Sequence, residues 1–330
     1  MLRGALIGLA LLTGTASPAA AEPSAPESVK FSRELKAFQS REARLFAIGW
    51  RLARANARYC DDTEYSSGLL LQDVASYGEP ALVRAALGLS GDFGVQAVAP
   101  ASPAEEGGLA VNDTVLSVDG VELDEAPLDP KRPWARLADI EKDIAASHGQ
   151  DGKITLKWRN PGGAEQTHSV AGIQVCSSRF ELATRGKRAL ADGTRVRFGA
   201  AFPAFAYAED ELAAAIAHEL AHNLLRHRAW LDTHGRKQSS VRLTEREADR
   251  LMPWLLANAG YDPQASLRFM ERWGPDHSGG IFRKRTHEGW DERAEAIAAE
   301  LEGMQQFIEP DGSADWRAHF TRETGPDTGS

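Results

Sequence analysis

Apolar residues recur at helical spacing in three long stretches of this chain. The first stretch predicts a single helix over Phe31–Tyr59, because its apolar residues fall on one stripe. The second, Leu212–Leu225, is rich in Ala and Leu and holds no Gly or Pro, which predicts a buried helix. The third begins at Thr244 and predicts another helix that ends near Gly260.

The middle of the chain has a different pattern, in which short alternating runs are separated by Gly, Asn and Asp. This pattern is typical of strands joined by turns. After a helix over about Trp134–Ser147, two strands are expected at Lys153–Arg159 and Glu165–Val170. A further strand, Thr194–Phe198, lies just ahead of the second long helix. The pattern therefore predicts an α+β protein with a β-rich insert.

The N-terminal residues have the pattern of a secretory signal peptide. A basic start at Arg3 precedes an apolar run over Gly4–Leu12, and Ala19–Ala21 offers a small-residue cleavage site. The run is too short to span a bilayer, and no later segment approaches about 18 uninterrupted apolar residues. We expect residues 1–21 to be removed and the chain to be periplasmic or secreted, with no integral membrane segment. The alternative is an uncleaved anchor.

Composition and charge narrow the choice of partners. Hydrophobic residues make up 42% and charged residues 26% of the chain, as in ordinary folded proteins. The net charge of −9 argues against nucleic acid and against an anionic membrane. The two cysteines, Cys60 and Cys176, could pair in an oxidising compartment and stabilise the fold by about 4–5 kcal/mol. Two free buried thiols are the alternative.

The segment Ala217–Asn223 carries the pattern His-Glu-x-x-His. On a helix, His218 and His222 lie one turn apart on one face, so both imidazoles can reach the same metal ion. Glu219 projects beside them, where its carboxylate can take a proton from an activated water. The alternative is an amphipathic helix whose histidines are satisfied in the core. Burying these three groups in so apolar a segment is costly without a partner such as a metal.

A third ligand is expected on the helix that follows, since a catalytic zinc usually keeps three protein ligands and one open position. Glu245 and Asp249 are four residues apart and share a helix face. One of them can bind the metal while the other holds a ligand histidine by its second ring nitrogen. In the alternative interpretation Thr244 and Glu247 form a capping box, and Glu245 is an ordinary acid of the first turn.

Together, these motifs resemble those of the zinc metallopeptidases related to the CAAX prenyl endopeptidase and the HtpX heat-shock protease. The matching segments are His-Glu-Leu-Ala-His and, further on, Glu-Arg-Glu-Ala-Asp. The resemblance implies one Zn²⁺ per chain, bound by His218, His222 and Glu245, with Asp249 behind the ligands. It also implies a strand near Val196 that pairs with the substrate backbone.

The family carries a third motif, His-Pro-x-x-x-x-Arg, which the segment from His287 to Arg293 matches except that Glu288 replaces Pro. The resemblance implies that Arg293 stabilises the transition state and that His287 lies near the metal. In the alternative interpretation Arg293 is a surface residue paired with Glu288 or Glu292, at little energetic value.

Residues 68–175 resemble a bacterial-type PDZ domain. The resemblance rests on the segments 91–98, 100–109 and 112–121, which include the run Ser-Pro-Ala and the strand before Asp119-Gly120. Such domains add a peptide to a sheet edge and bind its terminal carboxylate with the amides of a glycine-rich loop. Here that loop would consist of Gly91, Asp92, Phe93 and Gly94. A small sandwich that only packs on the protease is the alternative.

The expected fold is α+β: a mostly helical, gluzincin-type metalloprotease domain with a small active-site sheet, interrupted by a β-rich PDZ domain. The predicted parts are a signal peptide (1–21), a helical segment packing on the protease (22–67), a PDZ-like domain (68–175), a metallopeptidase domain (176–305) and a polar, loosely held tail (306–330).

The predicted function is an exported zinc endopeptidase that cleaves envelope or misfolded proteins, with a C-terminal peptide as a possible ligand of the PDZ domain. One alternative is a periplasmic chaperone or adaptor with a latent protease core, in which His287 blocks the metal. A zinc hydrolase acting on a non-peptide bond is a third class, with no positive support in the sequence.

Overall fold

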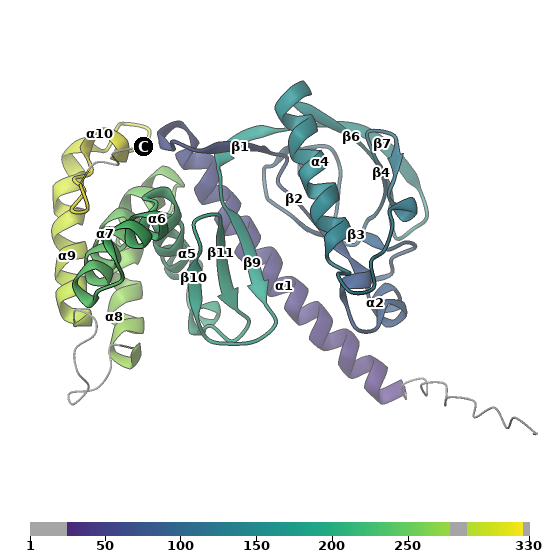
Figure 1. Cartoon of the computed structure of the whole chain (residues 1–330), viewed down its shortest axis with the longest axis horizontal. Coiled ribbons are helices and arrows are strands. Elements are labelled where there is room, and N and C mark those ends of the chain that lie inside the picture. Colours follow the sequence, from purple (N-terminus) through teal and green to yellow (C-terminus); the bar gives the residue numbers. More distant parts are fainter. Residues whose placement is uncertain (1–24, 278–288, 326–330) are drawn as a thin grey trace, which may run out of the picture.

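One long helix connects the two halves of the molecule. The computed structural model describes residues 25–277 and 289–325. Helix α1 (Ala25–Asn56) continues into a short 3-10 helix, η1 (Ala57–Tyr59), which confirms the predicted helix and begins it six residues earlier. Figure 1 shows α1 running diagonally, with the β-rich insert on one side and the bundle α5–α10 on the other. Its residues Leu45 and Leu52 are fully buried, so α1 is part of the core.

The β-rich insert is a twisted sheet with helices packed on it. Its strand order is β2-β3-β4-β6-β7, and the short β5 pairs with β4. Phe93, Leu156 and Trp158 are fully buried in its core. The elements are β2 (Leu69–Asp73), η2 (Val74–Ser76), α2 (Pro80–Leu87), β3 (Phe93–Val98), α3 (Pro103–Glu106), β4 (Thr114–Val118), β5 (Val121–Glu122), η3 (Leu123–Glu125), α4 (Ala135–Asp151), β6 (Lys153–Arg159) and β7 (Glu165–Ala171). The predicted strands at 153–159 and 165–170 are confirmed.

A two-stranded ladder ties the ends of the insert together. Strand β1 (Thr63–Ser66) pairs antiparallel with β8 (Ile173–Cys176), with Thr63 opposite Cys176. The predicted disulfide between Cys60 and Cys176 is present at the base of this ladder. Because the chain enters and leaves the insert through this one ladder, the insert is joined to the rest of the protein at a single place.

The second half is a helical bundle with a small mixed sheet. The sheet order is β10-β11-β9, in which β11 pairs parallel with β9 and antiparallel with β10. Its elements are β9 (Arg179–Ala183), β10 (Ala189–Ala191), β11 (Arg195–Gly199), η4 (Pro203–Ala206), α5 (Glu209–Leu224), α6 (His227–His234), α7 (Gln238–Asn258), α8 (Ala265–His277), α9 (Trp290–Met304), η5 (Gln305–Phe307) and α10 (Trp316–His319). The strand predicted at 194–198 is therefore the central one.

Two sequence-based predictions about this half are wrong. Helix α7 begins at Gln238, so Thr244 lies inside it, donates its hydroxyl to the Val241 carbonyl, and forms no capping box. The residues after 305 are not a loose tail as far as they are described. Trp316 and Phe320 are buried, and Trp316 Nε1 donates to Asn56. The C-terminal segment 306–325 is therefore part of the core that joins α1 to the bundle.

No helix in the described ranges has the length and apolarity needed to cross a membrane. The predicted signal peptide, residues 1–21, lies outside the described residues. The architecture is thus a mixed α+β fold in which a β-rich insert is attached beside a helical bundle.

The disulfide yields the first testable prediction. Replacing Cys60 and Cys176 with Ser should lower the free energy of unfolding by about 4–5 kcal/mol, because the unfolded chain loses a cross-link across a separation of 116 residues. Urea denaturation of the double variant and of the parent protein measures this difference. Equal unfolding free energies would contradict it, and thiol labelling of the denatured parent serves as the control for pairing.

Candidate metal centre and peptide groove

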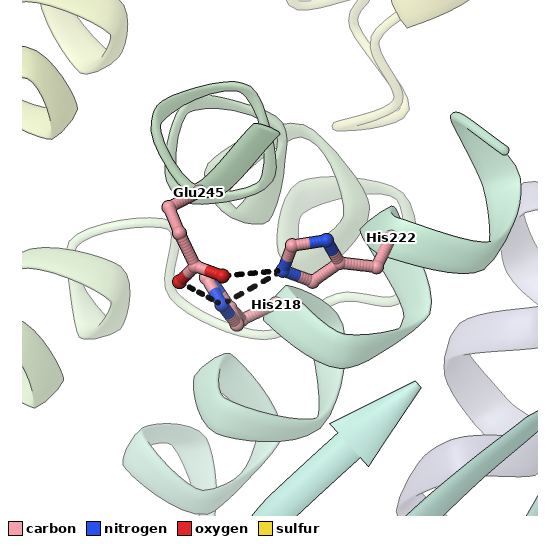
Figure 2. A group of neighbouring side chains, drawn as sticks. All are labelled: His218, His222 and Glu245. Carbon is pink, nitrogen blue, oxygen red and sulfur yellow. Dashed lines mark hydrogen bonds and ion pairs between the residues drawn. The ribbon is translucent and has the colours of Figure 1, made fainter. Parts of the chain in front are cut away.

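Helix α5 places its polar residues on the rim of an otherwise apolar core. Leu212, Ile216 and Leu220 are fully buried, which fixes the rotation of the helix. At its start, the Glu211 carboxylate accepts from the Ala208 amide, as a first-turn acid does at a helix N-terminus. With this face buried, His218 and His222 come to lie one turn apart and point toward α7, as Figure 2 shows.

Glu245 of α7 completes a cluster of three groups that could hold a metal ion. The His218 and His222 Nε2 atoms lie 3.2 Å apart. Glu245 places Oε2 3.5 Å from His218 Nε2 and Oε1 3.6 Å from His222 Nε2 (Figure 2). In a tetrahedral zinc site with bonds of about 2.0–2.1 Å, ligand atoms lie about 3.3–3.4 Å apart. The spacing and the chemistry of the donors therefore fit Zn²⁺.

Asp249 and Arg293 stand behind these groups. Asp249, one turn after Glu245, is fully buried and places Oδ1 3.0 Å from His218 Nδ1. Arg293 of α9 forms a bidentate pair with Asp249, with Nε–Oδ2 at 2.5 Å and Nη2–Oδ1 at 2.7 Å. Its Nη2 also lies 3.6 Å from Glu245 Oε2. Arg293 thus pairs with Asp249 behind the cluster and lies beside Glu245, the acidic residue of the cluster.

Two assignments from the third motif have different outcomes. Arg293 is only 9% exposed, so the alternative in which it is a surface residue is wrong. Glu288, one of the partners named in that alternative, lies outside the described residues. It pairs with Asp249 and lies near Glu245, and its action on the transition state stays a prediction. His287 falls outside the described residues.

The environment shifts the pKa values of these groups strongly. Burial raises the pKa of Glu219 to about 7, a value suited to exchanging a proton near neutral pH. Burial alone would lower the pKa of His218, but the carboxylates of Asp249 and Glu245 outweigh it and raise the pKa to about 10. Metal binding must therefore displace a proton from His218.

A second pair of buried residues supports His222. His227, the first residue of α6, places Nδ1 2.8 Å from His222 Nδ1, and its Nε2 lies 2.9 Å from Glu247 Oε2. His227 is 1% exposed and Glu247 is fully buried. From the sequence alone, His227 is as consistent with a solvated residue as with a functional one, and Glu247 is assigned only to a cap. The signal for both was their position, five residues after His222 and inside the Glu-Arg-Glu-Ala-Asp segment.

A cavity of about 510 Å³ opens in front of the cluster of His218, His222 and Glu245. His218, Glu219, His222 and Glu245 lie on its wall, and β10 forms one side. Val196 does not line it, because β11 is covered by β9 and β10. Strand β10 lines the cavity and lies at an edge of the sheet. The strand that could pair with a substrate backbone is therefore β10, and not the expected strand near Val196.

The Gly91–Gly94 segment of the insert does not form an open carboxylate-binding loop. The Asp92 carboxylate is paired with Arg84 and Arg136, and the Phe93 side chain is fully buried. Gly94 pairs with Gln72 on one side and Thr114 on the other, because β3 is an interior strand. The segment is a structural turn, and the prediction that it binds a peptide terminus is wrong.

A different groove lies between β2 and α4. Strand β2 ends the sheet order, and β3 is its partner there. The groove has a cavity of about 180 Å³ lined by Leu69–Leu71 of β2 and by Ile144, Ala145 and His148 of α4. Trp50 of α1 and Phe180 of β9 form its far wall. An extended peptide that enters here would add to the edge of β2 and contact both halves of the molecule.

Comparison with known proteins identifies one module of the chain. The family model described as a PDZ domain matches residues 94–131, from β3 to the loop after η3. The chain contains a PDZ domain. The match covers less than half of the chain and thus identifies only this module. No curated protein and no solved structure matches the chain. A PDZ domain indicates peptide or protein binding, and the groove beside β2 is the surface that suits it.

The metal cluster yields a second prediction. Glu245→Gln should remove most bound zinc, because a neutral amide replaces a carboxylate ligand in a site whose histidines lie within 3.6 Å of it. Elemental analysis of the purified proteins measures the zinc content. Glu302→Gln, an exposed residue of α9, is the matched control. Full zinc retention in the Glu245 variant would remove Glu245 from the ligand set.

Proposed function

We propose that this protein is an exported zinc endopeptidase whose PDZ domain binds a peptide segment. The observation that carries the proposal is the cluster of His218, His222 and Glu245, with the proton-accepting Glu219 on the same cavity wall. In the proposed site the three clustered residues hold Zn²⁺. When bound, the ion would polarise the scissile carbonyl and acidify a water molecule.

The side chains around the cluster have distinct tasks in this proposal. Glu219 accepts a proton from the attacking water and returns it to the leaving amine, which its raised pKa favours. Asp249 and Arg293 hold His218 and Glu245 in place. The exposed edge of β10 binds the substrate as an additional strand and sets one peptide bond above Glu219.

Export to an oxidising compartment is the second part of the proposal. It is supported by the disulfide between Cys60 and Cys176, since such bonds persist mainly outside the reducing cytosol. The predicted signal peptide at residues 1–21 is consistent with it. Envelope proteins and misfolded exported proteins are the proposed substrates.

The test of catalysis is Glu219→Gln. This change removes the proton acceptor but leaves the three metal-binding residues in place, so digestion of casein should be abolished while zinc content stays unchanged. Cleavage by the variant at the parent rate would reject the mechanism. A parent protein that binds zinc yet cleaves nothing would favour the alternative of an adaptor with a latent protease core.

The PDZ groove can be tested separately from catalysis. Ala145 is exposed on α4 and lines the groove, whereas its neighbour Ala146 is exposed and does not. Ala145→Arg should fill the groove and reduce binding to an array of peptides with free C-termini by tenfold or more, on the order expected for blocking a buried contact area. Ala146→Arg is the matched control and should bind like the parent. Equal loss or equal retention in both variants would place the peptide site elsewhere.

A further inference from the structure

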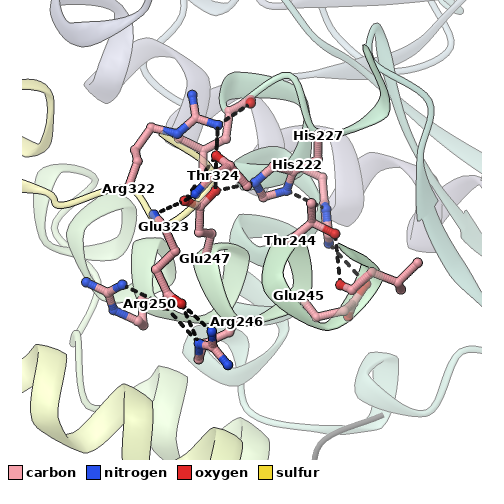
Figure 3. Close-up of polar contacts among 12 residues, drawn as sticks. His222, His227, Thr244, Glu245, Arg246, Glu247, Arg250, Arg322, Glu323 and Thr324 are labelled. Atoms are coloured by element: carbon pink, nitrogen blue, oxygen red, sulfur yellow. Dashed lines mark hydrogen bonds and ion pairs between the residues drawn. The ribbon is translucent and has the colours of Figure 1, made fainter. Parts of the chain in front are cut away.

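Residues Phe320–Thr324, near the end of the C-terminal segment 306–325, pack against α7, the helix that holds Glu245. Phe320 is buried, and Arg250 of α7 lies over its ring, 5.1 Å from the centroid. The Glu323 carboxylate forms ion pairs with Arg246 and, at 3.0 Å, with Arg250. Figure 3 shows Glu323 with Arg246 and Arg250 of α7. These contacts fasten the segment to the outer surface of the helix.

The backbone of the same segment reaches inward to Glu247. The Thr324 amide donates to Glu247 Oε1 at 2.7 Å, and the Glu323 amide donates to the same oxygen. The Thr324 hydroxyl lies 2.9 Å from Oε2, and Arg322 Nη2 lies 3.6 Å from it. A fully buried carboxylate needs such donors, because burying it without partners costs several kcal/mol.

The proton positions along this chain of contacts follow from its ends. A histidine that binds a metal through Nε2 carries its proton on Nδ1, so His222 Nδ1 is a donor toward His227 Nδ1, 2.8 Å away. His227 must then accept at Nδ1 and carry its proton on Nε2, which lies 2.9 Å from the Glu247 carboxylate. The Glu247 carboxylate accepts from the Glu323 and Thr324 amides at Oε1 and faces His227 at Oε2. As an acceptor it selects the one tautomer of His227 that can hold His222 in the ligand orientation.

We infer that Arg322–Thr324 is a positioning element of the metal centre, acting through Glu247 and His227 on the ligand His222. Figure 3 shows the continuous path from Thr324 to His222. The inference rests on the proposed metal centre and extends it to a segment 77 residues from Glu247 in sequence. Outer partners of ligand histidines usually change metal affinity by about 10–100-fold when they are replaced.

The experiment measures zinc affinity by competition with a chromophoric chelator, using the full chain. His227→Gln and Glu247→Gln should each weaken zinc binding by about 10–100-fold. Thr324→Val removes the hydroxyl, which donates to Glu247 and accepts from Arg322, and should weaken zinc binding by a smaller factor. Thr324→Ser keeps the hydroxyl and should keep the parent affinity. Arg317→Gln breaks an exposed ion pair with Asp61 in the same part of the chain and is the matched control.

A second readout separates positioning from general destabilisation. Co²⁺ bound at the site reports ligand geometry in its visible spectrum, which should shift in Glu247→Gln and Thr324→Val but not in Arg317→Gln. Parent-like zinc affinity and Co²⁺ spectra in all Glu247, His227 and Thr324 variants would overturn the inference. A parent protein that binds zinc but cleaves no protein rejects the proposed function alone, since the affinity changes remain measurable. A parent that binds no zinc rejects both.

Discussion

The interior of the bundle depends on the mutual pairing of ionisable groups that have been taken out of water. Asp249, Glu247 and His227 are at most 1% exposed, and Arg293 is nearly as deeply buried. An unpaired charge in such a place costs several kcal/mol, a large share of the about 5–15 kcal/mol by which an ordinary domain is stable. Each of these groups therefore has a partner of opposite charge or a hydrogen-bonding partner within 3.0 Å.

Helix α7 carries acidic residues on two of its faces, and each face pairs with different groups. Glu245 and Asp249, one turn apart, face His218, whereas Glu247 lies between them in sequence and faces His227 and the C-terminal segment. One face of the helix therefore contributes to the candidate metal site. Another face contributes Glu247, the partner of His227, which supports His222. Packing of α7 against α5 fixes the distance between the two histidines and the carboxylate, because Leu251 and Leu255 are fully buried with Leu212 and Ile216.

The sequence was sufficient for the parts of this arrangement that depend on local spacing. His218, His222, Glu245 and Asp249 were selected because residues four apart share a helix face, and the structure brings them together. The early start of α7 could not be predicted, since its first turn is polar and has no apolar stripe. The peptide groove was misplaced because the glycines around Phe93 match a loop pattern, whereas burial of β3 is decided by its pairing with β2 and β4.

Contacts between distant segments were also beyond local patterns. His227 and Glu247 are 20 residues apart, and each on its own fits a surface residue of a helix. The polar composition after residue 305 predicts a loose tail, but the buried Trp316 and Phe320 and the contacts of Glu323 and Thr324 with α7 anchor it. Such burial becomes visible only when the partner surface, here α1 and α7, is in place.

The chain enters and leaves the PDZ domain through the β1–β8 ladder, and this has a consequence for how the chain folds. The core of the bundle unites Leu45 and Leu52 of α1 with β9, α5 and α7, and the whole PDZ domain lies between these segments in sequence. During synthesis α1 therefore emerges long before its partners, while the PDZ domain can complete its own core first. Its closed ends at β1 and β8 then bring α1 next to β9 and shorten the loop that must close. A folded insert with closed ends thus lowers the entropic cost of joining α1 to β9 in the core of the bundle.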